Sequence, residues 1–218
     1  MFVGHYSVSF VAKSVEKSIP LWVLFVAAQL IDIIWASFIF SGVERVRIVP
    51  HFTASNHLDL YYMPYTHSLL GACVWAILAG IVFKFFARSS GKAAVWVALT
   101  VVSHWFIDLL VHKPDLTLWG GEQKMGFALW DNMPVALTLE CLILLIGIWL
   151  YVRSLEAPST QRKIWILTFG LGMCGLQIYS LYMPPAPNDK AMAATALASY
   201  IILAVVAFLF DRKKTRRG

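Results

Sequence analysis

The segment Ala93–Val111, with the sequence AAVWVALTVVSHWFIDLLV, decides how this chain folds. A helix needs about 20 mostly apolar residues to cross a bilayer, so the segment predicts a membrane-spanning helix. Within it, His104 and Asp108 stand four residues apart, which stacks an imidazole and a carboxylate on one helix face. Ionisable groups in hydrocarbon are costly unless they pair, face water or hold a cation, so this pair indicates a functional site.

The composition of the whole chain supports the same class of protein. It is 59% hydrophobic and 14% charged, with a mean hydropathy of +0.69, which excludes an ordinary soluble domain. Six apolar segments predict six spanning helices, and we expect an all-α integral membrane protein built as a six-helix transmembrane bundle. The segments are Pro20–Phe40, Leu69–Ala87, Ala93–Val111, Pro134–Val152, Ile164–Met183 and Ala193–Phe210.

A shorter amphipathic helix is predicted over Val3–Lys17, ahead of a break at Pro20. It has two possible placements. It can lie flat on the inner leaflet, or it can form a hairpin with the first spanning helix, lifting His5 by about 18–20 Å to the height of Asp32. Periodicity alone slightly favours the flat helix. A role for His5 requires the hairpin, and the fold expected here has this helix packed back toward the site.

The distribution of basic residues predicts the orientation in the membrane. Most lysines and arginines fall on one side of a six-helix topology, so the positive-inside rule places both termini in the cytoplasm. The loops 41–66 and 112–133 then face outward. The basic tail Asp211–Gly218 is interpreted as an anchor on anionic lipid and not as a nucleic-acid site. We expect one membrane domain over residues 1–218, with the site motifs in 1–115 and supporting helices plus the basic tail in 116–218.

Several ionisable residues are expected at one depth in the outer half of the membrane. They are His5, Asp32, His67, His104, Asp108 and Glu140. Imidazoles and carboxylates are the donors that a site for one or two zinc ions uses. Each residue also has a structural alternative as a hydrogen-bonded acid, an interfacial histidine or a simple ion pair. If these alternatives held, several ionisable residues with unrelated structural roles would lie at the same membrane depth by coincidence. A single metal site explains the shared depth directly, so the pattern favours a metal site.

Two short motifs carry a resemblance to a known family. They are Thr66-His67-Ser68 and Ser103-His104-Trp105-Phe106-Ile107-Asp108. Two further features belong to the same pattern: a histidine near the start of the chain and the acid at the end of Gln29-Leu30-Ile31-Asp32. Together they resemble the YdjM-like inner-membrane metal-dependent hydrolases, which are distantly similar to zinc-dependent phospholipase C. The resemblance covers about residues 1–115, and the last two predicted helices carry none of it.

The resemblance implies a ligand set. Asp32, His67, His104 and Asp108 would hold one zinc, and Asp108 would bridge to a second ion that His5 helps to bind. Two features depart from the family pattern. The histidine expected at helical spacing before Glu140 is replaced by Ala136, and an L-P-D-x-D pattern is reduced to Leu30-Ile31-Asp32. The resemblance leaves catalytic or supporting roles for His112 and Glu140.

The chemistry expected of such a site is phosphoester hydrolysis on a lipid or lipid-linked phosphate. Basic residues of the outward loops could attract an anionic head group, although solvated loop charges are the commoner explanation. These residues are Arg45, Arg47, Lys113 and Lys124, and the loops also hold His51, His57, Asp59 and Asp115. The alternatives are a transporter that moves divalent cations or protons through the same residues, and a non-catalytic accessory subunit.

Overall fold

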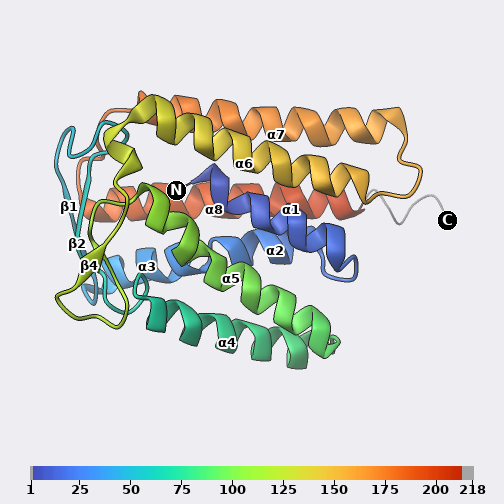
Figure 1. Ribbon diagram of the computed structural model, residues 1–218, viewed down its shortest axis with the longest axis horizontal. Coiled ribbons are helices and arrows are strands. Elements are labelled where there is room, and N and C mark those ends of the chain that lie inside the picture. The colour runs from blue at the N-terminus through green and yellow to red at the C-terminus, as the bar shows by residue number, and fades with distance from the viewer. Residues whose placement is uncertain (1, 213–218) are drawn as a thin grey trace.

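The computed structural model describes residues 2–212 as a set of helices that run roughly along one long axis, with short strands at one end (Figure 1). The helical elements are η1 (Val3–His5), α1 (Tyr6–Val15), α2 (Leu21–Ala28), α3 (Leu30–Ser41), α4 (Leu69–Phe86), α5 (Gly91–Val111), η2 (Leu129–Asp131), α6 (Met133–Arg153), α7 (Thr160–Leu181) and α8 (Asp189–Arg212). The strands are β1 (Arg45–Ile48), β2 (Leu58–Tyr62), β3 (Leu116–Thr117) and β4 (Lys124–Met125).

Helix length and hydropathy identify an integral membrane protein with several spans. Among the described residues, five helices, α4 to α8, are long and apolar enough to cross a membrane, and the number rises to six if the bent pair α2 and α3 forms one span. Large apolar side chains such as Ile77 and Phe86 point outward and are exposed, as lipid-facing residues are. The helical membrane fold is thereby confirmed. The cytoplasmic placement of the termini stays a prediction, and residues 213–218 of the expected basic tail lie outside the described residues.

The first expected span differs from the prediction because it is not one continuous helix. α2 and α3 meet at an angle of 53° across Gln29, whose backbone leaves the helical conformation at φ −105° and ψ 8°. The side-chain amide of Gln29 donates to the carbonyl of Phe2, which ties the break to the N-terminal segment. The break places Asp32 in the first turn of α3, where the helix dipole stabilises a carboxylate.

The N-terminal helix lies inside the bundle and not on a membrane surface. α1 packs against α6, α2 and α5, and His5 at its start is only 1% exposed. A Cβ atom built on Gly147 of α6 would lie 2.6 Å from the carbonyl oxygen of Ser7, so the two backbones touch at this glycine. Packing of this helix back against the bundle is confirmed, and the flat amphipathic placement is wrong.

A buried lysine closes the turn between α1 and α2. The Nζ atom of Lys13 donates to the carbonyls of Lys17 and Ile19, at 3.1 and 2.5 Å. Farther from the turn, Ser9 of α1 donates to the carbonyl of Leu24 in α2. The lysine satisfies two backbone carbonyls of the turn, and the serine links the two helices, so these bonds hold the hairpin closed.

Thiol labelling tests the hairpin directly. In a background with the three native cysteines changed to serine, His5→Cys is expected to resist a membrane-impermeant maleimide, because residue 5 is fully packed. Lys17→Cys is expected to react, since the Lys17 side chain is 50% exposed at the turn. The measurement is the fraction of each cysteine labelled in inside-out and right-side-out vesicles. Ready labelling of residue 5 in either vesicle would contradict the hairpin.

The strands form two short antiparallel hairpins that the helical prediction did not include. β1 pairs with β2 through Arg47 opposite Asp59, and β3 pairs with β4 through Leu116 opposite Met125. A further bridge joins Ser68, just before α4, to Thr117. These hairpins lie at the end of the bundle where α5 ends and α4 begins (Figure 1). They therefore cover the end of the bundle that carries the ionisable residues.

Candidate metal centre

Six ionisable side chains from five segments converge at the covered end of the bundle. His5 comes from η1, Asp32 from α3, His67 from the residues before α4, and both His104 and Asp108 from α5; His112 follows α5 directly. All but Asp32 are nearly fully buried, and the Asp32 side chain is 13% exposed. The structure thus brings together the five residues that the sequence suggested as ligands. We refer to these six residues as the His/Asp cluster.

Asp108 lies at the centre of the His/Asp cluster and faces histidines with both of its oxygens. Its Oδ2 atom is 3.1 Å from Nε2 of His104 and 3.7 Å from Nε2 of His67. Its Oδ1 atom is 3.1 Å from Nε2 of His5 and 3.5 Å from Nε2 of His112. A carboxylate with imidazoles at each oxygen has the arrangement needed to bridge two cations.

Asp32 divides its two oxygens between the histidines and a tyrosine. The Oδ1 atom is 3.3 Å from Nε2 of His67 and 3.5 Å from Nε2 of His104. The Oδ2 atom accepts a hydrogen bond of 2.8 Å from the hydroxyl of Tyr200 on α8. Because the tyrosine holds one oxygen, the other is oriented toward the two imidazoles.

Three of the four histidines in the cluster, His67, His104 and His112, are oriented by hydrogen bonds on their outer nitrogens. Nδ1 of His104 donates to the carbonyl of Ala28 at the α2–α3 break, and Nδ1 of His112 donates to Asp115, both at 2.8 Å. Nδ1 of His67 lies 2.8 Å from the Thr66 hydroxyl. A neutral imidazole that donates from Nδ1 presents a lone pair at Nε2. The three Nε2 atoms therefore face the carboxylates as potential metal ligands, an orientation typical of metal-binding histidines.

The spacing of the donors fits a metal ion. Four ligand atoms placed tetrahedrally about 2.0–2.2 Å from an ion lie about 3.3–3.6 Å from one another. The four distances from Nε2 of His67 and His104 to the facing oxygens of Asp32 and Asp108 are 3.1–3.7 Å. The buried Nε2 atom of His104 also has no hydrogen-bond partner among the described residues, a costly state that a cation would relieve.

Two groups of residues meet the distance requirement for metal ligands. One contains Asp32, His67 and His104, and the other contains His5, His104 and Asp108. They share His104, and the rings of His5 and His104 stack with centroids 3.8 Å apart. The buried His/Asp cluster could therefore hold one or two ions, and the donor set does not by itself identify the metal.

Glu44 and Thr66 support the cluster, although sequence analysis did not select them. Glu44 is buried at 1% exposure and accepts from the backbone amides of Tyr65 and Thr66 and from the Thr66 hydroxyl, at 2.6 Å. Since that hydroxyl gives its one proton to Glu44, its oxygen accepts from Nδ1 of His67. The position of Thr66 immediately before His67 was visible in the sequence, whereas the partner 22 residues earlier was not.

Thr66→Val tests this support. The substitution keeps the shape of the side chain and removes the hydroxyl, so His67 loses the acceptor that fixes its ring. We expect metal affinity to fall by about 10–100-fold, as for other lost supporting hydrogen bonds. Chelator competition on the purified protein measures the change. Thr66→Ser, which keeps the hydroxyl, is the matched control, and equal affinity in the valine variant and wild type would contradict the role.

His112 and Glu140, the two residues suggested for catalysis, occupy different environments. Burial acts to lower the pKa of His112, but the carboxylates of Asp108 and Asp115 outweigh it and raise that pKa. Glu140 on α6 accepts hydrogen bonds from the backbone amides of Phe2 and Gly4, at 2.9 and 3.5 Å. These contacts make Glu140 an anchor for the N-terminal segment, while His112 directly faces the cluster. Their catalytic roles stay predictions.

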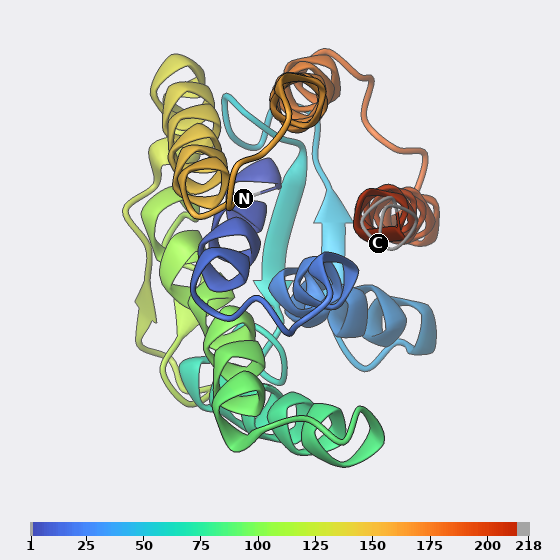
Figure 2. The same ribbon diagram turned by 90° about the vertical axis from the view of Figure 1, so that its right-hand side faces the viewer.

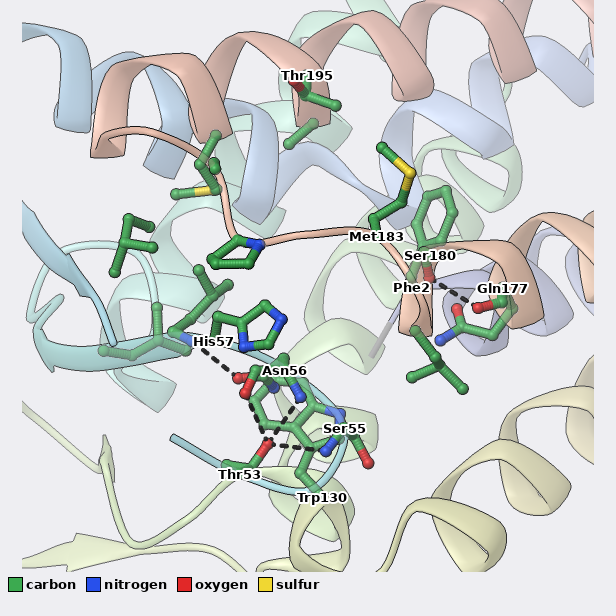
Figure 3. A pocket seen from close by; sticks show the side chains of 18 of the residues that line it. Phe2, Thr53, Ser55, Asn56, His57, Trp130, Gln177, Ser180, Met183 and Thr195 are labelled. Atoms are coloured by element: carbon green, nitrogen blue, oxygen red, sulfur yellow. Dashed lines mark hydrogen bonds between the residues drawn. The ribbon is translucent and has the colours of Figure 1, made fainter. Parts of the chain in front are cut away.

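A cavity of about 940 Å³ adjoins the His/Asp cluster. Asp32, His67, Asp108 and His112 line one part of it, and the loop between β1 and β2 lines another, including Thr53, Ser55, Asn56 and His57 (Figure 3). This volume is near the upper end of the roughly 300–1,000 Å³ typical of ligand sites. His51, interpreted from the sequence as a loop residue, also lines the cavity. The candidate ligands are therefore accessible to a substrate of substantial size.

Most of the basic residues proposed to attract a head group have other partners. Arg47 lies 3.5 Å from Asp59 and above the ring of Tyr61. Lys113 lies 3.4 Å from Asp131 and donates to the carbonyl of Phe52. Arg47 and Lys113 thus stabilise the loops, which favours the structural explanation for their charges.

These observations define a multi-span membrane protein with a buried His/Asp cluster that could bind metal and a cavity beside it. No family model, no curated protein and no solved structure matches the chain.

Proposed function

We propose that this protein is a membrane-embedded, metal-dependent hydrolase that cleaves a phosphoester of a lipid or lipid-linked substrate. The observation that carries the proposal is the set of four imidazole Nε2 atoms around the Asp108 carboxylate. A simple proton relay does not require several oriented Nε2 lone pairs around shared carboxylates, whereas a metal centre does. The motif resemblance to YdjM-like hydrolases supports the same function, with zinc as the expected metal.

A divalent cation held by these residues supplies Lewis-acid polarisation of a phosphoryl oxygen and acidifies water, the two requirements of phosphoester hydrolysis. The residues of the chain provide the rest. Asp32, His67, His104 and Asp108 would form one ligand set, and His5 with Asp108 would contribute to a second. His112 is placed to exchange a proton at Nε2, because its Nδ1 atom is held by Asp115. The low-dielectric surroundings would strengthen each of these interactions.

Reconstitution in vesicles tests the proposal. Metal-loaded protein in liposomes that contain phosphatidylglycerol and phosphatidic acid is expected to release phosphate or a phosphorylated head group. His104→Ala and Asp32→Ala should abolish the release, because each removes a ligand from the shared set. Arg47→Ala is the control, since it alters a loop charge outside the cluster. Mass spectrometry of the lipids and a phosphate assay measure the products.

The main alternative gives a different result in the same vesicles. A transporter built on these residues would move a divalent cation or protons across the sealed membrane and leave the lipids intact. Cation flux without hydrolysis, across a panel of lipids and lipid-linked phosphates, would overturn the enzyme proposal.

A further inference from the structure

The cavity beside the His/Asp cluster extends toward the connected ends of α7 and α8, two helices whose ring contact, Phe169 with Phe210, lies far from their connection. α7 packs on α6, whereas α8 packs on α2 and α3. The connection of residues 182–188 crosses the space between their ends, as the end-on view shows (Figure 2). The cavity is lined by the last turn of α7, by this connection and by the first three turns of α8. It therefore reaches the side of the bundle as well as its covered end.

The two parts of the cavity differ in chemistry. The part near α5 carries the acids and imidazoles of the cluster. The lining from α7, the connection and α8 is neutral throughout, with Leu181, Met183, Thr195, Ala196 and Ser199 among its residues. A cavity that is ionic at one end and neutral at the other matches an amphiphile, whose phosphate and hydrocarbon parts require different surroundings.

Both walls of the neutral part reach the outer surface of the bundle. Met183 is 43% exposed and Thr195 is also exposed, although both line the cavity. In the close view, Thr195 of α8 and Met183 after α7 lie on separate elements around the cavity (Figure 3). The apolar residues Ile178 on α7 and Ile202 on α8 are exposed nearby. A membrane lipid beside these helices would meet the cavity between them.

A buried acceptor within the cavity provides an independent indication of a ligand. Gln177 of α7 lines the cavity at 6% exposure, and its Oε1 atom has no hydrogen-bond partner among the described residues. A buried amide oxygen without a hydrogen-bond partner destabilises the empty cavity, so it favours a ligand that brings a donor. The hydroxyls of the glycerol head group of phosphatidylglycerol are such donors, and they lie next to the phosphate.

We propose that the cavity opens sideways to the membrane between α7 and α8, and that it admits a glycerophospholipid whose phosphate points to the His/Asp cluster. The acyl chains leave the cavity past Ala196 on α8 and Met183 after α7; we call this exit the lateral opening. The proposal names the substrate of the proposed hydrolase and its access route, and in that respect it rests on the proposed function. Lipid binding can nevertheless be measured without catalysis.

Photocrosslinking tests the binding step. The full-length protein is placed in vesicles that contain a small fraction of phosphatidylglycerol with a diazirine on one acyl chain. Adducts are expected on peptides of the lateral opening, residues 177–183 and 191–199. Ala196→Trp should reduce their yield by about ten-fold, because a large side chain fills the opening. Ala198→Trp is the matched control: residue 198 is exposed on the same helix and does not line the cavity. Unchanged adducts in the Ala196 variant would overturn the proposal.

Turnover of two substrates tests the access route. Ala196→Trp should lower hydrolysis of long-chain phosphatidylglycerol by about ten-fold or more, while a water-soluble dibutyryl analogue loses about two-fold at most. Met183→Trp, on the opposite wall, is the second variant if the first fails to fold. If the hydrolysis rates of both substrates fall equally and the adducts are unchanged, the lateral opening is rejected, while the proposal of a hydrolase still stands. Adducts that depend on residue 196, without hydrolysis of any substrate, would support the lateral opening and reject the hydrolase.

Discussion

Asp108→Asn is expected to remove most of the metal that the purified wild-type protein retains, whereas Glu140→Gln should remove little. The Asp108 carboxylate faces four imidazoles within 3.7 Å, two at each oxygen. An amide supplies a weak neutral oxygen and a nitrogen without a lone pair for metal, so the group of His5, His104 and Asp108 loses its only carboxylate. The group of Asp32, His67 and His104 loses the anionic oxygen that lies 3.1 Å from His104 and 3.7 Å from His67. Glu140 only anchors backbone amides of the N-terminal segment. The loss should exceed the roughly 10–100-fold typical of supporting residues.

Metal analysis by inductively coupled plasma mass spectrometry measures this difference, with protein concentration determined on the same samples. Wild type is expected to carry one or two transition-metal equivalents, and His104→Ala to behave like Asp108→Asn because it belongs to both ligand groups. The same metal content in the Asp108 and Glu140 variants would show that Asp108 does not bridge.

Gly147→Val is the second substitution with a large expected effect. A Cβ atom at residue 147 would lie 2.6 Å from the Ser7 carbonyl oxygen and 2.9 Å from the Ser7 Cα atom, and backbone atoms cannot rotate away as a side chain can. α1 must then move off α6, and His5 moves with it because it lies two residues before Ser7. Overpacking of this kind costs about 1–3 kcal/mol or more.

The expected results are a lower melting temperature and loss of the metal equivalent that depends on His5. Gly175→Val on α7 is the matched control, because a Cβ atom at that helical glycine would meet nothing within 4 Å. Differential scanning fluorimetry and metal analysis compare the two variants. If both variants melt and bind metal like wild type, the close contact between α1 and α6 has no role in the site.

The predictable part of the site was local in the sequence. His104 and Asp108 could be assigned to one face because the helical repeat fixes that relation within a single element. The apolar length of each segment similarly predicted the spanning helices, since the bilayer imposes that length on any spanning helix. Asp32 and His67 could be placed at the same height because helix rise converts sequence position into depth.

The remaining features depend on contacts between distant segments. Tyr200 binds Asp32 from 168 residues away, and a single tyrosine in an apolar helix gives no signal of such a partner. Glu44 directly precedes the short strand β1, in a loop of ordinary polar composition, so its role in supporting His67 could not be predicted from the sequence. The bend at Gln29 was also not predictable, because the local sequence is continuously apolar on both sides and the Gln29 amide donates to the carbonyl of Phe2, 27 residues earlier.

The contact between Ser7 and Gly147 has a consequence for how the protein is made. α1 leaves the ribosome before α6, and the two contact residues are about 140 residues apart in the chain. At roughly 5–20 residues per second, the wait is about 7–28 s. During that time the N-terminal helix has no final partner on α6, and His5 cannot be held in its place. We therefore expect the complete ligand set to form late in biogenesis, so that metal loading follows membrane insertion of α6.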